Sequence, residues 1–273
     1  MASMCTLVVC RAKRAAYPLC VAASRDEDPE RRASPPGLHH VGHVRAVFPR
    51  DRRDGGSWVG CNEHGLVAAI TNFTDSNPGA SKQVLSRGRI LTAALGEASL
   101  VRAEVVVRRI VETHRVRGFG LYLGDRDEGL WVHGGGGRSF ETREASGDLE
   151  VLGNDREPGS TEIDGLAEWW AGASAPDVFD IEAILDRLVV VLATGRARAT
   201  STATSSGTPR RSIDADGTWP VCIQSGVPRT THATWIAVPR GDHPWHIRHA
   251  HGNPCEVSPR DYSWLADRMV ADD

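Results

Sequence analysis

A cysteine, an arginine and a carboxylate near the start of the chain are spaced so that they can meet. Cys5 begins a short apolar run, and Arg25 and Asp26 follow a second one, with a basic turn between the two runs. Two such runs predict an antiparallel hairpin in which residues pair when their numbers sum to about 27. That register sets Cys5 opposite Ala22 or Ala23, so Arg25 and Asp26 emerge beside the thiol.

This group of residues suits nucleophilic catalysis by a cysteine. A nearby arginine favours thiolate over thiol, and Asp26 can hold the arginine or an amine by a charge-assisted hydrogen bond. A free α-amine, with a pKa of roughly 7.7–8.0, can act as the base for its own side chain. The chemistry therefore needs a chain that starts at Cys5, and we expect either that translation starts at Met4 or that residues 1–4 are a removable leader. The alternative is a surface ion cluster at a strand end.

The same motifs carry a family resemblance. MCT at residues 4–6, AASRDE at 22–27 and DGGSWVGCNEHGLVAAITNF at 54–73 resemble the NRDE family, also called the transport and Golgi organisation 2 family. Weaker similarity continues through most of the chain. The resemblance implies an α+β fold of the N-terminal nucleophile hydrolase type. In that fold two mostly antiparallel sheets lie between helix layers, as an αββα sandwich.

The first hairpin and the strand after it also resemble the choloylglycine hydrolases and penicillin V acylases, in which an N-terminal cysteine attacks an amide. The residues that fall on those motif positions are Cys5, Arg25, Asn72, Asn154 and Arg229. The resemblance implies that Asn72 and Asn154 bind the oxyanion. A side-chain N–H at the end of a buried strand is also a suitable donor on physical grounds. Asp26 fits the NRDE pattern, whereas Asp28 fits the acylase spacing.

Histidines are concentrated near the end of the chain, in PWHIRHAH at 244–251. His249 and His251 would share one face of a strand, a spacing that suits a metal or a haem iron. No cysteine or carboxylate completes a ligand set there. We therefore interpret the segment as a solvated strand face and expect neither a metal nor a cofactor.

The elements that must position these residues are short strands and a few helices. The order of strands, two helices, strands, a helix and strands is typical of an α+β domain, which we expect to span 1–273. Expected strands cover 5–10, 17–23, 57–61, 65–73, 119–125, 129–135, 138–144, 149–154, 219–225, 231–239 and 244–250. Expected helices cover about 81–98, 99–114, 177–194 and 259–269. Prolines predict a loop over 25–37, and the polar segment 200–212 predicts a mobile loop.

Composition excludes several classes of protein. The net charge of −3 over 273 residues argues against nucleic-acid binding, which needs a basic domain. No apolar run approaches the roughly 20 residues that span a bilayer. The six cysteines include no C-x-x-C pair, which indicates free thiols and a cytoplasmic location.

Two hypotheses of function follow. In the first, the protein is a cysteine amidohydrolase or acyltransferase that acts on a small acylated substrate. In the second, which the family resemblance implies, it binds and carries haem, acyl-CoA or a lipid without turnover. Neither hypothesis includes a nucleic-acid partner.

Overall fold

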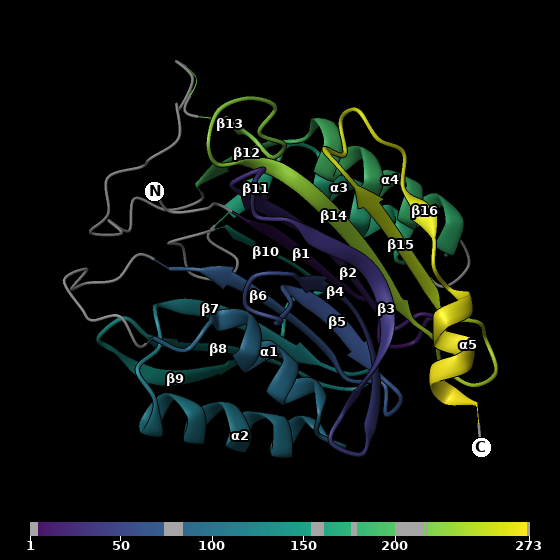
Figure 1. The fold of residues 1–273 in the computed structure, drawn as a ribbon. Helices are drawn as coiled ribbons and strands as arrows, with labels where there is room; N and C mark the ends of the chain where they lie inside the picture. The colour runs from purple at the N-terminus through teal and green to yellow at the C-terminus, as the bar shows by residue number, and fades with distance from the viewer. Residues whose placement is uncertain are drawn as a thin grey trace.

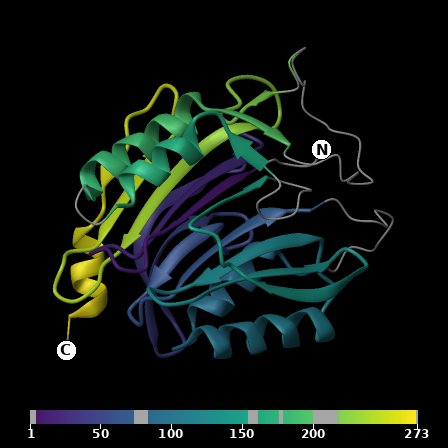
Figure 2. The ribbon, with the colours of Figure 1, turned by 180° about the vertical axis from the view of Figure 1, so that it is seen from behind.

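Two antiparallel sheets lie face to face, and helices cover the outer face of each sheet (Figure 1). The computed structural model describes residues 5–73, 84–153, 161–175, 179–199, 216 and 218–271. Seen from behind, the same helix–sheet–sheet–helix layers are visible (Figure 2). The predicted αββα sandwich is therefore confirmed.

The first sheet has six strands in the order β10-β1-β2-β14-β15-β16. Its members are β1 (Thr6–Arg11), β2 (Leu19–Glu27), β10 (Leu149–Gly153), β14 (Arg229–Val238), β15 (His246–His251) and β16 (Arg260–Asp261). The N-terminal hairpin thus lies inside the sheet, between β10 and β14. A small third sheet joins β11 (Thr161–Ile163), β12 (Arg196–Ala199) and β13 (Trp219–Pro220).

The second large sheet has seven strands that follow one another in chain order. They are β3 (Ala33–Val41), β4 (Val44–Asp51), β5 (Val59–Asn62), β6 (Val67–Asn72), β7 (Phe119–Gly124), β8 (Gly129–Gly135) and β9 (Arg138–Glu144). The predicted hairpin of 57–61 and 65–73 corresponds to β5 and β6. As expected of a central strand with apolar residues on both faces, β6 is buried almost throughout.

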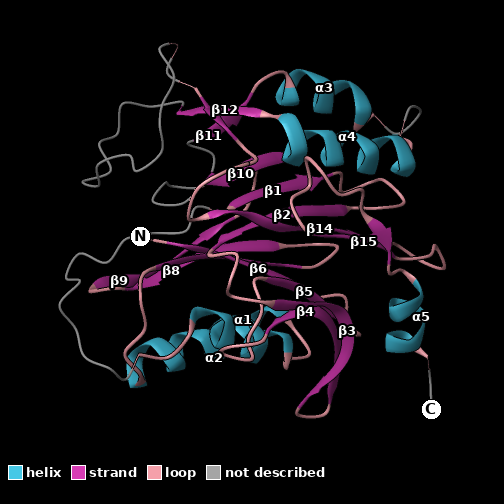
Figure 3. Ribbon diagram, turned by 45° about the horizontal axis from the view of Figure 1, so that its top comes forward, coloured by secondary structure: helices cyan, strands magenta, loops and turns pink. Residues whose placement is uncertain are grey.

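The helices form the two outer layers. On the seven-stranded sheet lie α1 (Arg87–Leu95) and α2 (Leu100–Thr113), and on the six-stranded sheet lie α3 (Leu166–Ala173) and α4 (Ile181–Thr194). Figure 3 shows both sheets between these helix pairs, with α5 (Trp264–Val270) at one end. None of the helices in the described part of the chain is long and apolar enough to cross a membrane.

Strand periodicity explains how β1 serves two cores. Leu7 and Val9 face the core between the two sheets, whereas Val8 and Cys10 face the core under α3 and α4. Alternate side chains of a strand point to opposite faces. A strand between two apolar layers must therefore be apolar at most positions, and this holds β1 between the two cores.

The predicted register of the first hairpin is wrong. Leu7 pairs with Ala23, and Cys10 pairs with Cys20, so Cys5 does not lie opposite Ala22 or Ala23. The reason is a longer turn, closed by a hydrogen bond from the Ala12 N–H to the Pro18 carbonyl. If the observed pairing continues two residues beyond the Leu7–Ala23 pair, Cys5 lies level with Arg25.

The predicted loop at 25–37 is too long, because only residues 28–32 form a loop. The strand β2 continues to Glu27, and β3 contains both Pro35 and Pro36. Proline is tolerated on an edge strand or at a bulge because no ladder hydrogen bond is needed there. β3 is the edge strand of its sheet, and its pairing shifts between Ser34 and Gly37.

Other expectations had mixed outcomes. The remaining predicted strands and helices are present with shifted ends, whereas α3, β3, β4, β11, β12 and β16 were not predicted. The segment 200–212 lies outside the described residues. The prediction of six free thiols is wrong, because Cys222 and Cys255 form a disulfide between segments that only the fold brings together.

Candidate active site

A cavity of about 600 Å³ is lined by residues of both large sheets and of the segment that leads into α1. Of the residues predicted from sequence, it brings together Cys5, Arg25, Asp26 and Asn72. Cys5 comes directly before β1, Arg25 and Asp26 lie near the end of β2, and Asn72 ends β6. The site is therefore built where strands of the two sheets end near one another.

Cys5 is nearly enclosed, with 7% of its surface exposed. The backbone N–H of the next residue, Thr6, donates to Ser24 Oγ at 2.9 Å and holds the strand start against β2. Burial raises the pKa of the Cys5 thiol to about 12, and the Asp26 carboxylate adds to the rise. A hydrogen bond from the Asp26 backbone and the charge of Arg25 act in the opposite direction but are outweighed. The expected thiolate is therefore not present at neutral pH.

Asp26 is completely buried beside the thiol. Its Oδ1 accepts a hydrogen bond of 2.6 Å from the Thr230 hydroxyl on β14. Asp28, the alternative carboxylate, is exposed and is not among the residues that line the cavity. The structure thus favours Asp26 over Asp28 as the carboxylate near Cys5.

Arg25 is held in an ion network and does not lie free beside Cys5. Its Nη2 donates to Asp51 Oδ2 at 2.7 Å, and its guanidinium lies 5.1 Å from the centre of the Trp58 ring. Its Nη1 donates to Thr231 Oγ1 at 3.2 Å. Arg25 therefore links the end of β2 to the end of β4 and supports the cavity wall.

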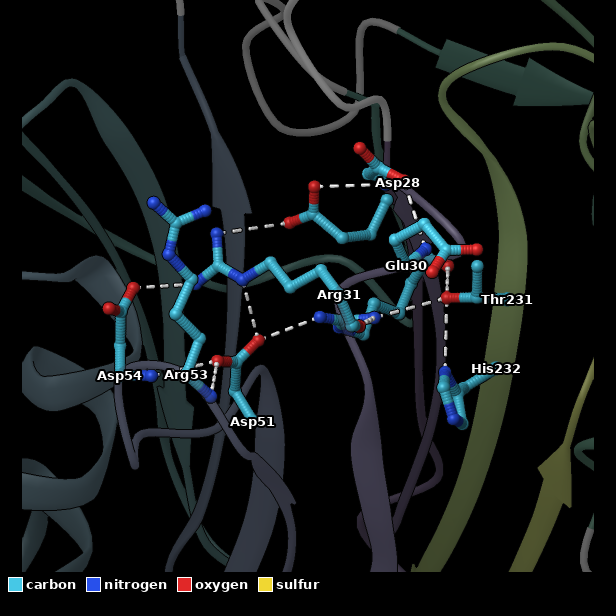
Figure 4. A network of polar contacts seen from close by, with 10 residues as sticks. Asp28, Glu30, Arg31, Asp51, Arg53, Asp54, Thr231 and His232 are labelled. Carbon is cyan, nitrogen blue, oxygen red and sulfur yellow. Dashed lines mark hydrogen bonds and ion pairs between the residues drawn. The ribbon is translucent and has the colours of Figure 1, made fainter.

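Asp51 is the centre of this network (Figure 4). It accepts hydrogen bonds from Arg25, from Arg31 Nε at 2.8 Å and from the backbone N–H groups of Arg53 and Asp54. Burial alone would raise the pKa of Asp51, but the Asp54 backbone and Arg31 outweigh it and hold that pKa below its ordinary value. Sequence reasoning missed Asp51, because only the packing of the two sheets brings it to Arg25.

The remaining predicted residues are placed differently. Asn72 is half-buried at the end of β6, opposite Phe119 on β7. Arg229 is exposed at the start of β14, where it lies opposite Glu27 in the register with β2. It lines a neighbouring groove instead of the cavity. Asn154 lies outside the described residues.

The cavity carries more cationic than anionic side chains. Its described lining includes six arginines and four carboxylates. The arginines are Arg25, Arg31, Arg53, Arg87, Arg89 and Arg117, and the carboxylates are Asp26, Glu27, Asp51 and Asp54. A cleft lined by an excess of one sign of charge attracts ligands of the opposite sign.

The interpretation of the late histidines as a solvated strand face is wrong for His249, whereas His251 is exposed. His249 is 1% exposed and packs against His232 of the adjacent strand, with ring centres 5.6 Å apart. Strand pairing brings His232 of β14 to the same face as His249 and His251, a neighbour that the sequence around β15 could not reveal.

The chain matches one family model, and its structure is similar to those of known hydrolases. The family model described as Transport and Golgi organisation 2 matches residues 4–159, and no curated protein sequence matches the chain. A mutant of the conjugated bile acid hydrolase from Clostridium perfringens has a similar structure, with a TM-score of 0.51 and 10% identity over 94% of this chain and 96% of that one. Penicillin V acylase from Agrobacterium tumefaciens gives a TM-score of 0.49 and 12% identity over 94% of this chain and 97% of that one.

Proposed function

Since the chain belongs to the Transport and Golgi organisation 2 family, we propose that it is a cysteine amidohydrolase or acyltransferase whose nucleophile is Cys5. The observation that supports this proposal is the shared cavity of Cys5, Asp26 and Asn72. The fold shared with a bile acid hydrolase is consistent with it. The active form in this proposal begins at Cys5.

Activation of the thiol depends on a free α-amine. With residues 1–4 attached, the nitrogen of Cys5 is an amide and cannot accept a proton, and the thiol pKa of about 12 keeps sulfur protonated. A free amine titrates near neutral pH. It can therefore take the thiol proton, while the buried Asp26 carboxylate holds the resulting ammonium group.

The reaction then balances in two steps. The Cys5 sulfur attacks the amide carbonyl and forms a C–S bond, and the Asn72 side chain donates to the developing oxyanion. The C–N bond breaks as the ammonium proton passes to the departing amine, which leaves a thioester on Cys5. Water, or an acceptor amine in an acyltransferase, attacks the thioester and releases the acyl group, and the thiol regains its proton.

The cavity favours a small anionic substrate. Its volume of about 600 Å³ lies within the usual range for small-molecule sites, roughly 300–1,000 Å³. The excess of arginines over carboxylates in the lining favours a carboxylate or phosphate on the substrate. Trp58 and Ile70 supply apolar contacts for the acyl part.

Hydrolysis of acyl amides by a protein that begins Met-Cys5 tests the proposal. The initiator methionine is removed when the next residue is small, which leaves Cys5 at the N-terminus. The substrates are N-acyl amino acids with chromogenic or mass-detectable products. We expect turnover that Cys5→Ala abolishes and that Cys61→Ala, which removes a buried thiol outside the cavity, retains. Absence of turnover across neutral and anionic amides in this protein would contradict the proposal.

The raised pKa of Cys5 favours a second candidate, a carrier without turnover. A protonated thiol in a cavity can line a binding site without reacting. In that case the protein that begins at Cys5 is as inert as the full chain, and haem or acyl-CoA binds saturably to both. A ligand titration followed by absorbance or calorimetry, run beside the hydrolysis assay, distinguishes the two candidates.

A further inference from the structure

Three histidines from two adjacent strands converge at the end of the six-stranded sheet. In the β14–β15 pair, His232 lies opposite His251, and Thr234 lies opposite His249. One ligand nitrogen from each histidine lies within 4.8 Å of the other two. His232 and His249 are buried, and His251 is exposed.

Two threonine hydroxyls orient the buried rings. Thr231 Oγ1 lies 3.0 Å from the Arg25 carbonyl, to which it donates, and 3.0 Å from His232 Nδ1. With the hydroxyl proton on that carbonyl, Nδ1–H donates to Thr231, and His232 Nε2 carries the lone pair. Nδ1 of His249 is bonded to Thr234 Oγ1 at 2.9 Å, which leaves Nε2 as the remaining nitrogen. A hydrogen bond to the second ring nitrogen is the usual support of a metal-binding histidine.

The second observation is a buried nitrogen that lacks a partner. His249 Nε2 has no hydrogen-bond partner among the described residues. A buried polar atom without a partner is unfavourable, and a ligand at this position would satisfy it.

The histidines lie beside a groove of about 480 Å³ that is separate from the Cys5 cavity. His232 and His251 line the groove together with Asn253 and Glu256. The charged groups around the cluster are mostly cationic, because Arg25 lies near His232 and Arg52 and Arg260 lie near His251, whereas Glu256 is the carboxylate in the groove lining. Such surroundings suit a metal ion held by strong bonds to nitrogen better than a cation held by charge alone.

We propose that His232, His249 and His251 form a binding site for a divalent transition metal of the zinc class. Three imidazoles with one remaining position open to solvent are a known ligand set for Zn²⁺. The groove supplies the fourth position for water or for an oxygen ligand. The proposal does not depend on the function of Cys5.

The required adjustment is small. Zn–N bonds of about 2.0–2.1 Å separate tetrahedral nitrogen ligands by roughly 3.3 Å, compared with the limit of 4.8 Å between the histidine nitrogens. Rotation of the exposed His251 side chain can shorten its distances, and small changes in the orientation of the other two rings about their threonine hydrogen bonds can bring the His232 and His249 nitrogens closer.

Equilibrium dialysis of the chelator-treated full chain against ZnCl₂ tests the site, with Co²⁺ absorption as an independent readout. We expect one saturable Zn²⁺ and the visible bands of tetrahedral Co²⁺ with nitrogen ligands. His251→Ala changes an exposed residue and should retain the fold. It should weaken binding at least about 100-fold, because even second-shell changes cost about 10–100-fold.

His232→Ala serves as a second ligand variant and His40→Ala as the control. His40 is exposed on β3, outside the cluster, and its variant should bind like the original protein. Thermal unfolding of each metal-free variant verifies that it is folded. Three results would overturn the proposal. They are the absence of saturable Zn²⁺ binding, binding by His251→Ala and His232→Ala that is as tight as that of the original protein, and a thiolate-to-cobalt absorption band, which would show that the metal binds at cysteine.

Discussion

At the scale of single residues, the environment of Cys5 explains why its N-terminus matters. The thiol is buried beside a carboxylate, and both effects raise its pKa. Arg25, which the sequence pattern suggested as the activating group, is bonded instead to Asp51 and has the smallest influence on the thiol. A base other than Arg25 must therefore remove the thiol proton, and the α-amine of Cys5 is our proposal.

Replacement of Asp26 should separate thiol reactivity from catalysis. Asp26→Asn removes the negative charge that raises the Cys5 pKa, so iodoacetamide labelling at pH 8 should become several-fold faster. A tenfold change corresponds to one pKa unit. In the protein that begins at Cys5, the same change should decrease amide hydrolysis, because the carboxylate no longer holds the ammonium group.

The matched control is Asp28→Asn, which changes an exposed carboxylate two positions along the chain. It should leave both labelling and hydrolysis unchanged. If Asp26→Asn labels no faster than the original protein, the carboxylate does not influence the thiol as described here.

At the scale of elements, one ion pair connects the two sheets at the cavity. Arg25 on β2 and Asp51 on β4 belong to different sheets, and their side chains are 5% and 9% exposed. Removal of one partner from a buried pair leaves an uncompensated charge. The pair therefore fixes the relative position of the two strand ends that carry the site.

Asp51→Asn should destabilise the protein by about 3 kcal/mol, since it leaves Arg25 without its buried carboxylate partner. The folded-state pKa of Asp51 is lowered from 3.8, so its contribution is present above pH 3.8 and is lost as pH falls below it. Urea unfolding at pH 7 and pH 3 measures both effects. The exposed pair of Arg198 and Asp164 offers the control Asp164→Asn, expected to cost less than about 1 kcal/mol. Equal costs for the two variants would contradict the structural role of Asp51.

The sequence could predict the local elements but not the contacts between them. Strand periodicity located β5–β10, and the motifs around Cys5 and Asn72 indicated two sides of one cavity. Asp51 and His232 could not be found in this way, because each meets its partners through pairing or packing of distant segments. The prolines of β3 misled the prediction, because edge position decides whether a proline is tolerated, and edge position depends on the whole sheet.

At the scale of the whole molecule, burial in two cores determines the behaviour of the thiols. Cys5, Cys10, Cys20 and Cys61 are free and buried. Burial raises the pKa of Cys5, Cys20 and Cys61 to about 12 and that of Cys10 well above 9.0. The folded protein therefore holds these protons more tightly than the unfolded chain does.

Stability should fall steeply at alkaline pH. Raised thiol pKa values contribute stability that is complete below the unfolded value of 9.0 and is lost as pH rises from 9.0 toward 12. Each thiol should lower the free energy of unfolding by about 1.4 kcal/mol per pH unit in that window. Urea unfolding at pH 8, 9, 10 and 11 measures the slope, and Cys61→Ala should reduce it by one thiol. A flat profile from pH 9 to 11 would show that the thiols ionise equally in both states.

The identity of the first residue of the mature protein tests the central claim most directly. Mass spectrometry of the intact native protein, together with sequencing of its N-terminal peptide, reads this residue without knowledge of the substrate. We predict a mature chain that begins at Cys5 with a free α-amine. A native protein that retains Met1–Met4 and hydrolyses amides at full rate would contradict the claim, because its Cys5 nitrogen is an amide and cannot serve as the base.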